Sequence, residues 1–441
     1  MMSWADTFLE NRLALHRRTN TQARLRRTDH AVNSDRLRPR LCYVVTHSMS
    51  TCFLRGQLAA MRASGFDVTL LTSPGKELDG LRRREQVAIH TIPMEREMHP
   101  WRDIRSLLQL YVTIRRIRPH IVNAGTPKAG LLGMLAAWMG GVPVRIYTLH
   151  GLRLETTTGL KRALLAFAER VTSRCATRVI CVSRSLRESY VRHRLASWRK
   201  LCVLGSGTCN GLDVSPFTGR SARIAESRRA QLRRQFGIPA DAPVLGAVGR
   251  LTRDKGIADL LVALDLVRQR FPDVHLLLLG DYEPSDPLPD AYLQRMGEDP
   301  HVHWCGFVGD VSPYYDAMDL LVHASHREGF PYVPIEGAAA GLPVVGYRVT
   351  GVVDAVADGV TGRLVAPRDV QHLSEAICRY VGDPQLRRRH GAAGRARVVG
   401  EFSQETVWEN LRQEYARLLR CGQIAIRTPE HEVSAPSHRA A

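Results

Sequence analysis

The sequence predicts an α/β fold made of two Rossmann-like domains, each with a parallel sheet that helices cover on both faces. From Leu41 onward, short β-rich runs alternate with helical patterns, which is typical of parallel sheets. The alternation pauses at the glycine-rich stretch Gly205–Phe217 and then restarts. The length of 441 residues is also too great for one hydrophobic core.

Short apolar runs that end in polar turns predict the strands of the first half. These strands are Leu41–Thr46, Val68–Thr72, Val87–Ile92, Ile121–Asn123, Val144–Leu149, Val179–Val182 and Cys202–Leu204. Helical patterns occupy Phe53–Ala63 and Arg102–Arg118, a further helix ends at Met139, and His47–Thr51 is predicted to be a loop.

The second half repeats the pattern. Its predicted strands are Val244–Gly249, Val274–Gly280, Val302–Trp304, Leu320–His323, Val344–Tyr347 and Arg363–Val365, and its helices are Arg220–Gly237, Ile257–Phe271, Val370–Val381, Gln385–Val399 and Gln404–Leu419. We therefore expect a first domain at 41–210, a second at 211–402 and a C-terminal helix at 403–421. The arginine-rich segment 1–40 and the tail 422–441 are expected to be disordered.

The composition limits the classes of partner. The chain carries 62 Lys and Arg against 43 Asp and Glu, a formal net charge of +19, which favours anionic partners. Nucleic acid is not expected, because no basic motif with interleaved aromatic residues occurs. The nine cysteines form no C-x-x-C pair, which fits free thiols in a reducing compartment. With no signal-peptide pattern and no bilayer-spanning run, we expect a cytoplasmic protein, at most peripheral at the inner face of the plasma membrane.

The basic helix Arg102–Arg118 has two interpretations. It carries five apolar residues on one side: Ile104, Leu107, Leu108, Tyr111 and Ile114. Such a stripe commonly faces the core of a domain. With its arginines turned outward, the helix would instead suit an anionic membrane surface.

Two carboxylates stand eight positions apart in Glu328-Gly-Phe-Pro-Tyr-Val-Pro-Ile-Glu336. Pro331 and Pro334 interrupt any single helix, so we expect Glu328 in a loop and Glu336 in the first turn of a helix that begins near Pro334. The strand Leu320–His323 precedes the loop, which places Glu328 at the carboxyl edge of a sheet, where ligands bind. Carboxylates repel phosphate but accept hydrogen bonds from vicinal hydroxyls. The alternative is a solvated loop glutamate and a carboxylate favoured by the helix dipole.

The turn Arg250-Leu-Thr-Arg-Asp-Lys255 follows the strand Val244–Gly249 and brings two cations to a helix start. Fixed positive charges beside free helix amides suit a diphosphate, although a charged loop without a ligand is the alternative. His47 and His150 follow strands at the same kind of edge. For His150, contact with a sugar hydroxyl and a structural role are equally favoured.

Metal sites are not expected. His301-Val-His303 alternates along a predicted strand without a further ligand cluster, so a structural role is favoured over a metal site. No convincing D-x-D motif of the kind that binds a metal-nucleotide complex occurs in the sequence.

The basic turn and the double-carboxylate spacing together resemble the donor site of family 4 glycosyltransferases, and are similar to bacterial capsule, O-antigen and lipid-linked-glycan enzymes. The resemblance covers most of Leu41–Leu419. It includes Thr148-Leu-His150-Gly151, Asn210-Gly-Leu-Asp213 and Gly280-Asp-Tyr-Glu-Pro-Ser-Asp-Pro287. It implies the GT-B fold, in which two Rossmann-like domains face each other across a cleft. The glycine that many members carry in the first loop is absent from Thr46–Thr51.

The resemblance implies four catalytic residues. Arg250 and Lys255 would neutralise the donor diphosphate, including the charge of the leaving group. Glu328 would lie against the donor sugar. His150 would approach the sugar from the other domain.

The resemblance also implies further donor contacts. Glu336 would hold the ribose hydroxyls. Phe307 and Val308 would border the nucleobase, and the amides beside His47 would approach the phosphates. The backbone next to Glu328 would line the sugar site through Gly329, Phe330 and Pro331.

The implied activity is retaining, metal-independent transfer of a hexosyl or N-acetylhexosaminyl group in bacterial surface-glycan synthesis. The donor would be a nucleotide-diphosphate sugar, usually a UDP-sugar, bound by the second domain, with no cofactor. The acceptor, lipid-linked or polysaccharide, would bind the first domain. One alternative is a nucleotide-sugar 2-epimerase of the same architecture. The other is a non-catalytic nucleotide-sugar-binding protein.

Overall fold

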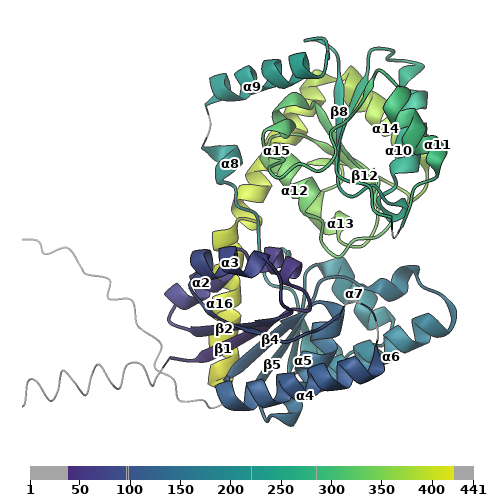
Figure 1. Cartoon of the computed structure of the whole chain (residues 1–441). Coiled ribbons are helices and arrows are strands. Elements are labelled where there is room, and N and C mark those ends of the chain that lie inside the picture. Colours follow the sequence, from purple (N-terminus) through teal and green to yellow (C-terminus); the bar gives the residue numbers. More distant parts are fainter. Residues whose placement is uncertain (1–37, 96, 98, 220, 285, 422–441) are drawn as a thin grey trace, which may run out of the picture.

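The computed structural model describes residues 38–95, 97, 99–219, 221–284 and 286–421. It consists of two α/β domains, one above the other in Figure 1. The sequence predicts disorder at both termini. Residues 1–37 and 422–441 of these segments lie outside the described part of the chain. Two parallel-sheet domains are what the sequence predicts, so the predicted fold class is confirmed.

The N-terminal domain is built on a seven-stranded sheet of order β3-β2-β1-β4-β5-β6-β7 in which every pair is parallel. Side chains alternate between the two faces of each strand. In β1, Cys42 and Val44 join one hydrophobic cluster, while Leu41 and Tyr43 join another on the opposite face. The strands are β1 (Arg40–Val44), β2 (Asp67–Thr72), β3 (Ala88–Thr91), β4 (Ile121–Gly125), β5 (Val144–Leu149), β6 (Arg178–Cys181) and β7 (Leu201–Cys202).

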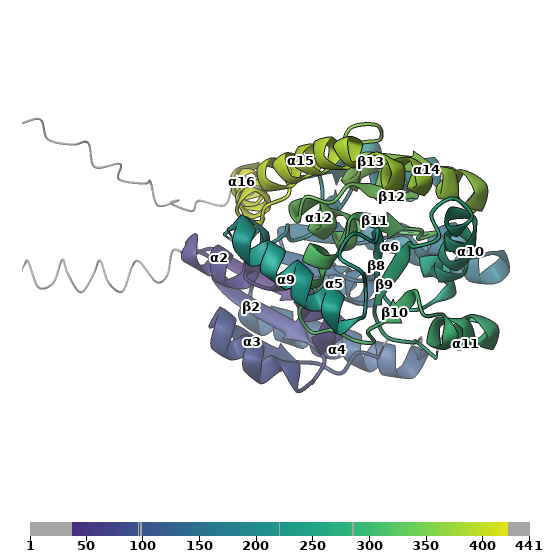
Figure 2. The same ribbon diagram turned by 90° about the horizontal axis from the view of Figure 1, so that it is seen from above.

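Helices cover both faces of this sheet (Figures 1 and 2). One layer contains α4 (Pro100–Ile117), α5 (Pro127–Met139) and α6 (Gly159–Cys175), and the other contains α2 (Gln57–Ala63), α3 (Glu77–Glu85) and α16 (Gln404–Cys421). The remaining helical segments are η1 (Ser48–Leu54), η2 (Arg153–Thr156), α7 (Arg184–Arg192) and η3 (Trp198–Lys200).

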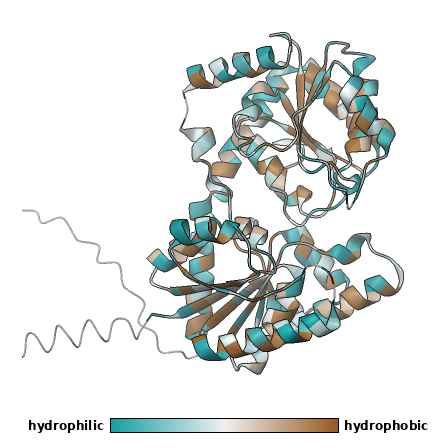
Figure 3. Ribbon diagram, viewed as in Figure 1, coloured by the Kyte–Doolittle hydropathy of each residue, from teal (hydrophilic) through white to brown (hydrophobic). Residues whose placement is uncertain are grey.

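The C-terminal domain has a six-stranded parallel sheet of order β10-β9-β8-β11-β12-β13. Its strands are β8 (Val244–Val248), β9 (His275–Leu279), β10 (Val302–Trp304), β11 (Leu320–His323), β12 (Val344–Tyr347) and β13 (Gly362–Val365). Its helical segments are α8 (Ser215–Thr218), α9 (Ala222–Gln235), η4 (Arg253–Lys255), α10 (Ile257–Arg268), α11 (Asp290–Glu298), η5 (Tyr314–Ala317), α12 (Tyr332–Ala339), α13 (Val352–Ala355), α14 (Val370–Gly382) and α15 (Pro384–Glu401). The brown strands in Figure 3 show how apolar both sheets are.

Both strand orders reverse once, between β1 and β4 and between β8 and β11. Beyond the carboxyl ends of such strands the two flanking loops part, which leaves a crevice for a ligand. The fold therefore selects two places in the sequence: the loops that follow β1 and β4, and the loops that follow β8 and β11.

Three local predictions need correction. Residues 48–54 form the 3-10 helix η1 rather than a loop, and Gly56, at φ +78°, separates η1 from α2 where one helix was predicted. The helix α12 begins at Tyr332 with Pro331 as its N-cap, so Glu336 lies in the second turn rather than the first. Pro334 fits the third helical position because amides of the first turn have no partner within the helix.

The last helix returns to the first domain, as the yellow ribbon in Figure 1 shows. On α16, the Tyr415 hydroxyl accepts a hydrogen bond from Asn123 Nδ2 (2.6 Å) and donates one to Tyr43 Oη (3.1 Å). Asn210, in the segment between the two sheets, donates to Arg55 O (2.9 Å) and accepts from Trp408 Nε1 (2.7 Å). Two chain crossings therefore join the domains.

A buried arginine fastens α9 to the second sheet. The Arg233 guanidinium donates to the carbonyls of Ala317 (3.2 Å) and Ala242 (2.8 Å) and pairs with Asp319 Oδ2 at 2.8 Å. The same carboxylate oxygen accepts from the amide of Val244, the first residue of β8. Without Arg233, Asp319 would keep only the more exposed Arg229, 2.8 Å from its Oδ1, as an ionic partner, and the buried carbonyls would lose their donor.

We expect Arg233→Leu to lower the free energy of unfolding by about 3–5 kcal/mol, because Asp319 and several carbonyls lose a buried donor. Urea denaturation followed by circular dichroism measures the effect. Arg234→Ala is the matched control, since Arg234 is the exposed neighbour on the same helix. An equal, small shift in the urea midpoint of both variants would contradict the assigned role.

Candidate active site

The candidate site lies where loops from the two sheets meet. The loop after β11, residues 324–331, touches the loops after β5 and β6 of the first domain. A Cβ atom added to Gly329 would lie 1.8 Å from the carbonyl oxygen of His150, and one added to Gly351 would lie 2.3 Å from Gly329 O. The Ser183 hydroxyl donates a hydrogen bond to Gly329 O at 2.8 Å. Only glycine allows this approach of the two backbones.

A helix terminus strengthens the same contact. Asp354 of α13 accepts hydrogen bonds from the amides of Arg184 (2.9 Å) and Ser185 (3.2 Å), which begin α7 in the first domain. A carboxylate at a helix N-terminus is favoured by the free amides and the helix dipole. The two domains are thereby held together beside the loop that carries Glu328.

Glu328 and Lys255 form a partly buried ion pair. Lys255 Nζ donates to Glu328 Oε1 at 2.6 Å, and His323 Nε2 lies 3.3 Å from the same oxygen without hydrogen-bond alignment. Burial acts to raise the pKa of Glu328, but the opposing attraction of the Lys255 ammonium and His323 holds that pKa well below its usual range. Glu328 is therefore ionised at neutral pH.

The loop around this pair contains buried polar atoms without protein partners. Within the described residues, His323 Nε2, Ser325 Oγ, His326 Nδ1 and Arg327 Nε are buried and accept or donate no hydrogen bond. Most buried polar atoms in folded proteins have a partner, so four such atoms in five residues mark an unusual segment. These four atoms can form hydrogen bonds with water or with a polar ligand.

Arg250 and Glu336 lie on the chain segments that carry the ion pair: Arg250 follows β8, and Glu336 is on α12. Arg250 pairs with Glu283 of the neighbouring loop, and its side chain is 54% exposed, so a ligand can reach it. The Tyr315 hydroxyl donates to Glu336 Oε2 at 2.8 Å. Burial raises the pKa of Glu336 above its usual value, while the Tyr315 hydrogen bond acts in the opposite direction. Within the described part of the chain, no protein group donates a hydrogen bond to the second oxygen of Glu336, which leaves that oxygen open to a hydroxyl group.

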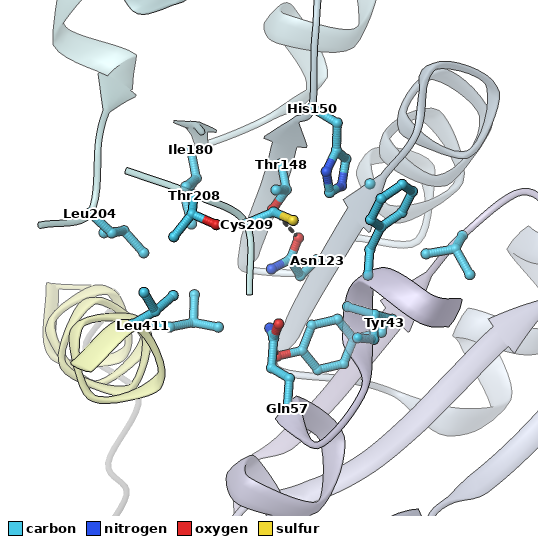
Figure 4. A pocket seen from close by; sticks show the side chains of 15 residues that line it. Tyr43, Gln57, Asn123, Thr148, His150, Ile180, Leu204, Thr208, Cys209 and Leu411 are labelled. Carbon is cyan, nitrogen blue, oxygen red and sulfur yellow. Dashed lines mark hydrogen bonds between the residues drawn. The ribbon is translucent and has the colours of Figure 1, made fainter. Parts of the chain in front are cut away.

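His150 is placed differently from what its sequence position suggests. Its carbonyl group meets Gly329, but Figure 4 shows its imidazole turned into a cavity of the first domain beside Thr148. The ring stacks on Phe53 with 5.3 Å between centroids. Burial lowers the pKa of His150 to about 4, so the imidazole is neutral at neutral pH and can act only as a hydrogen-bonding group.

The cavity beside His150 leads toward α16. About 30 Å³ of it admits the centre of a water molecule, which is enough for ordered water. Thr148 Oγ1 donates to Asn123 Oδ1 (2.7 Å), and Gln57 Nε2 donates to Tyr43 Oη (3.0 Å) (Figure 4). Gln57 Oε1 is buried without a protein partner in the described part. The cavity is thus apolar with a few polar atoms along one wall.

The structure places the other predicted site residues as follows. His47 is exposed and caps η1 by accepting from the Met49 amide at 3.3 Å. Phe307 is 78% exposed, beyond the end of β10, and Val308 beside it is half-buried. The Phe330 ring packs on Phe402 at 5.2 Å, away from Glu328, so only its backbone faces the loop. Pro331, the N-cap of α12, is buried.

Sequence reasoning missed His323, Ser325, Tyr315 and Thr126. His323 is the last residue of β11, so the edge argument used for Glu328 would have found it. Thr126 follows β4 with φ +67°, which is rare for a β-branched residue, and its hydroxyl lies 2.7 Å from that of Thr46. No sequence pattern predicts the positive φ of Thr126. None predicts that Tyr315 is the hydrogen-bond partner of Glu336 either.

Three histidines lie together at β9 and β10. His275 Nδ1 lies 2.9 Å from His303 Nε2, and His301 packs on the same ring. No group of three or more His, Cys, Asp or Glu in the described residues could hold a metal ion. In the same part of the chain, no helix is both long and apolar enough to cross a membrane.

Comparison with known proteins agrees with this geometry. Residues 51–207 match the model of the glycosyl transferase 4-like domain, and residues 242–383 match that of glycosyl transferases group 1. The chain is 35% identical over 381 residues to the capsular polysaccharide biosynthesis glycosyltransferase CapM of Staphylococcus aureus, covering 86% of this chain and 98% of CapM.

Two further relatives are more distant. A UDP-Gal:alpha-D-GlcNAc-diphosphoundecaprenol alpha-1,3-galactosyltransferase of Escherichia coli is 25% identical, covering 73% of this chain and 81% of the relative. The crystal structure of Anabaena Alr3699/HepE with UDP superposes with a TM-score of 0.70 at 21% identity, covering 85% of this chain and 99% of that one. The two family models together span most of both domains. This chain therefore belongs to the group 1, or family 4, glycosyltransferases with the GT-B fold.

Proposed function

We propose that this protein transfers a hexosyl or N-acetylhexosaminyl group from a UDP-sugar to a lipid-linked glycan during surface-polysaccharide synthesis, with retention of anomeric configuration. The observation that carries the proposal is the partly buried Lys255–Glu328 pair at the switch point of the second sheet. It puts a cation for phosphate and an acceptor for sugar hydroxyls within one hydrogen bond of each other. The capsular relative and the UDP-bound structural neighbour support the same substrate class.

The donor would lie along the carboxyl edge of the second sheet. The diphosphate would take Lys255 and Arg250 as counter-charges, and the ribose hydroxyls would donate to the free oxygen of Glu336. The exposed Phe307 would offer its face to the base. As the bond between the sugar and the diphosphate breaks, negative charge grows on the phosphate oxygens, so the two cations would stabilise the transition state more than the bound donor. In this proposal the reaction needs no metal ion, because these side chains neutralise the leaving group.

Binding of the diphosphate would release Glu328 from Lys255. The freed carboxylate would accept hydrogen bonds from the sugar hydroxyls and would face the positive charge that develops at the anomeric carbon. The partnerless polar atoms of residues 323–327 would complete the sugar site.

The first domain would hold the acceptor. The Escherichia coli relative acts on a diphosphoundecaprenol-linked sugar, and we extend that acceptor class to this chain as part of the proposal. His150, whose neutral ring lies in the cavity of Figure 4, would keep the loop after β5 in place beside the acceptor rather than contact the acceptor by charge.

Two measurements test the proposal. Thermal-shift titration with UDP, GDP, ADP and their sugars identifies the base, since ligand binding to the native state raises the melting temperature. Incubation of the stabilising donor with a polyprenyl-diphosphate sugar then tests transfer, and NMR of the product gives its anomeric configuration. Isomerised donor without acceptor would instead indicate a 2-epimerase. Donor binding with no turnover on any acceptor would indicate a binding protein.

We predict that Arg250→Ala and Lys255→Ala each lower kcat/KM by a factor that corresponds to about 2–4 kcal/mol of lost transition-state stabilisation. The value of kcat should fall as well, because charge grows on the diphosphate as the bond breaks. The losses should not add in the double variant, since both cations act on one group. Lys255→Arg should recover only part of the activity because a planar guanidinium does not replace a compact ammonium.

Arg253→Ala is the control for these variants. Arg253 lies in the same turn and is exposed, but its guanidinium donates to Pro287 O at 2.8 Å. Steady-state kinetics with the cognate donor should show little change in this variant. A kcat close to wild type in both Arg250→Ala and Lys255→Ala would refute the proposed role.

We also predict a pH-dependent donor affinity through Glu336. Because burial raises the pKa of this carboxyl, it takes up a proton at a higher pH than a free glutamate. Donor affinity should therefore be highest well above that pKa and fall as the pH is lowered through it. Glu336→Gln should weaken donor binding by about 1.5–3 kcal/mol and abolish the pH dependence.

A 2′-deoxyribose donor distinguishes this role from a structural one. Wild type should bind the deoxyribose donor more weakly than the ribose donor, and Glu336→Gln should discriminate little between them. Calorimetric titration across the pH range measures both effects. Unchanged discrimination in the variant would remove Glu336 from the ribose site.

A further inference from the structure

Large exposed apolar side chains gather on one layer of the first domain. The outer apolar face, as we name it, comprises nine residues of α4, α5 and α6: Trp101, Ile104, Leu108, Val112, Trp138, Met139, Leu160, Leu164 and Phe167. Trp101 is 86% exposed and Leu160 is 87% exposed. These helices lie together on the side of the sheet opposite to α2 and α16 (Figures 1 and 2). Extended exposed apolar patches mark interaction surfaces.

The helix α4 is apolar on two opposite sides. Ser106, Leu110 and Ile114 are buried against the domain, which satisfies the core interpretation of this helix. Ile104 and Leu108, predicted to share that side, are exposed instead. With Trp101 and Val112, they recur every three or four residues and so form a second stripe, half a turn away from the buried one. Figure 3 shows the resulting mixture of apolar and polar residues along α4.

The helix α6 repeats this arrangement. Leu160, Leu164 and Phe167 follow one another at spacings of four and three residues and are exposed. Arg170 and Arg174 continue the same side of the helix toward its C-terminus. The exposed side of α6 is therefore apolar at its beginning and cationic at its end.

The charge of this layer is strongly positive. The three helices carry two carboxylates, Asp103 and Glu169, against nine cations: Arg102, Arg105, Arg115, Arg116, Lys128, Lys161, Arg162, Arg170 and Arg174. Both carboxylates are occupied, because Asp103 pairs with Lys128 at 2.7 Å and Glu169 accepts from the Tyr190 hydroxyl at 2.9 Å. Burial also raises the pKa of Glu169 to about 7, which reduces its charge further.

The arginines border the apolar stripe of α4. Arg105 lies three residues before Leu108, and Arg115 and Arg116 lie three and four residues after Val112. None of these three arginines makes an ion pair with another described residue. An apolar stripe edged by unpaired cations is complementary to a bilayer with anionic headgroups, where each basic residue near the surface adds to the attraction.

We infer that the outer apolar face docks on an anionic lipid bilayer, with its tryptophan, leucine and phenylalanine side chains in the interfacial region and its arginines at the headgroups. In a parallel α/β domain, the helix that follows a strand begins at the carboxyl edge of the sheet. Trp101 and Leu160 stand at those beginnings, on the same edge as the candidate site. Docking would bring the cleft close to the membrane. The inference rests on the proposed function only in that a lipid-linked acceptor would be found there.

Vesicle flotation of the full chain tests the inference without donor or acceptor. We expect the protein to float with vesicles of equal parts phosphatidylglycerol and phosphatidylcholine, much less with phosphatidylcholine alone, and less at high salt. The variants Ile104→Ser with Leu108→Ser, and Leu160→Ser with Phe167→Ser, should each lower the ratio of bound to free protein by at least about tenfold. Circular dichroism melts confirm that both variants are folded.

The matched control carries Ile224→Ser and Val399→Ser, two exposed apolar residues on α9 and α15 of the second domain, and should float like wild type. Flotation of the α4 and α6 variants at the wild-type level would overturn the inference. So would a wild-type dimer, seen by light scattering, that these variants convert to monomers, because a second copy would then cover the face. Transfer of sugar to a water-soluble acceptor should be the same in wild type and in all variants. If wild type transfers no sugar to any acceptor, that result contradicts the proposed function but not the membrane docking.

Discussion

The partly buried ion pair between Lys255 and Glu328 is the interaction on which the candidate site depends. Each partner compensates for the burial of the other, since an unpaired ammonium or carboxylate at this depth would be strongly unfavourable. The pair also connects the loop after β8 with the loop after β11, the two loops of the switch point. A ligand that brings both negative phosphate and sugar hydroxyls can exchange this single contact for two. Before a ligand binds, Lys255 and Glu328 therefore satisfy each other's charge within the site.

The loop that carries Glu328 also connects the two domains. Gly329 packs closely against His150 and Gly351 because neither Gly329 nor Gly351 carries a Cβ atom that would meet the neighbouring carbonyl oxygen. Ser183 and Asp354 add hydrogen bonds across the same boundary. Movement of one domain relative to the other must therefore shift the segment that holds the carboxylate. Domain arrangement and site geometry are coupled through these backbone contacts.

In the layer of α4, α5 and α6, the helix α4 has one apolar side packed in the core of the domain and a second apolar side exposed on the surface. Leu110 faces the sheet, whereas Leu108 faces outward with two tryptophans of the same layer. A core-facing stripe alone would leave the outer side polar. This surface combines nine exposed apolar side chains with arginines that make no ion pair with another described residue. The topology places the start of this surface beside the cleft, because parallel strands and their following helices share one edge.

The sequence by itself determined the fold class, most strands and the placement of Arg250, Lys255 and Glu328, because hydrophobic periodicity, glycine and proline act locally along the chain. Even Glu336 was expected on the correct helix, although α12 begins earlier than Pro334. Only the tertiary structure decided which groups meet. Lys255 and Glu328 are 73 residues apart, and Tyr43 and Tyr415 are 372 apart. It also decided that the His150 ring turns into its own domain and that Leu108 faces outward. Such choices depend on packing between distant segments, which a local pattern does not record.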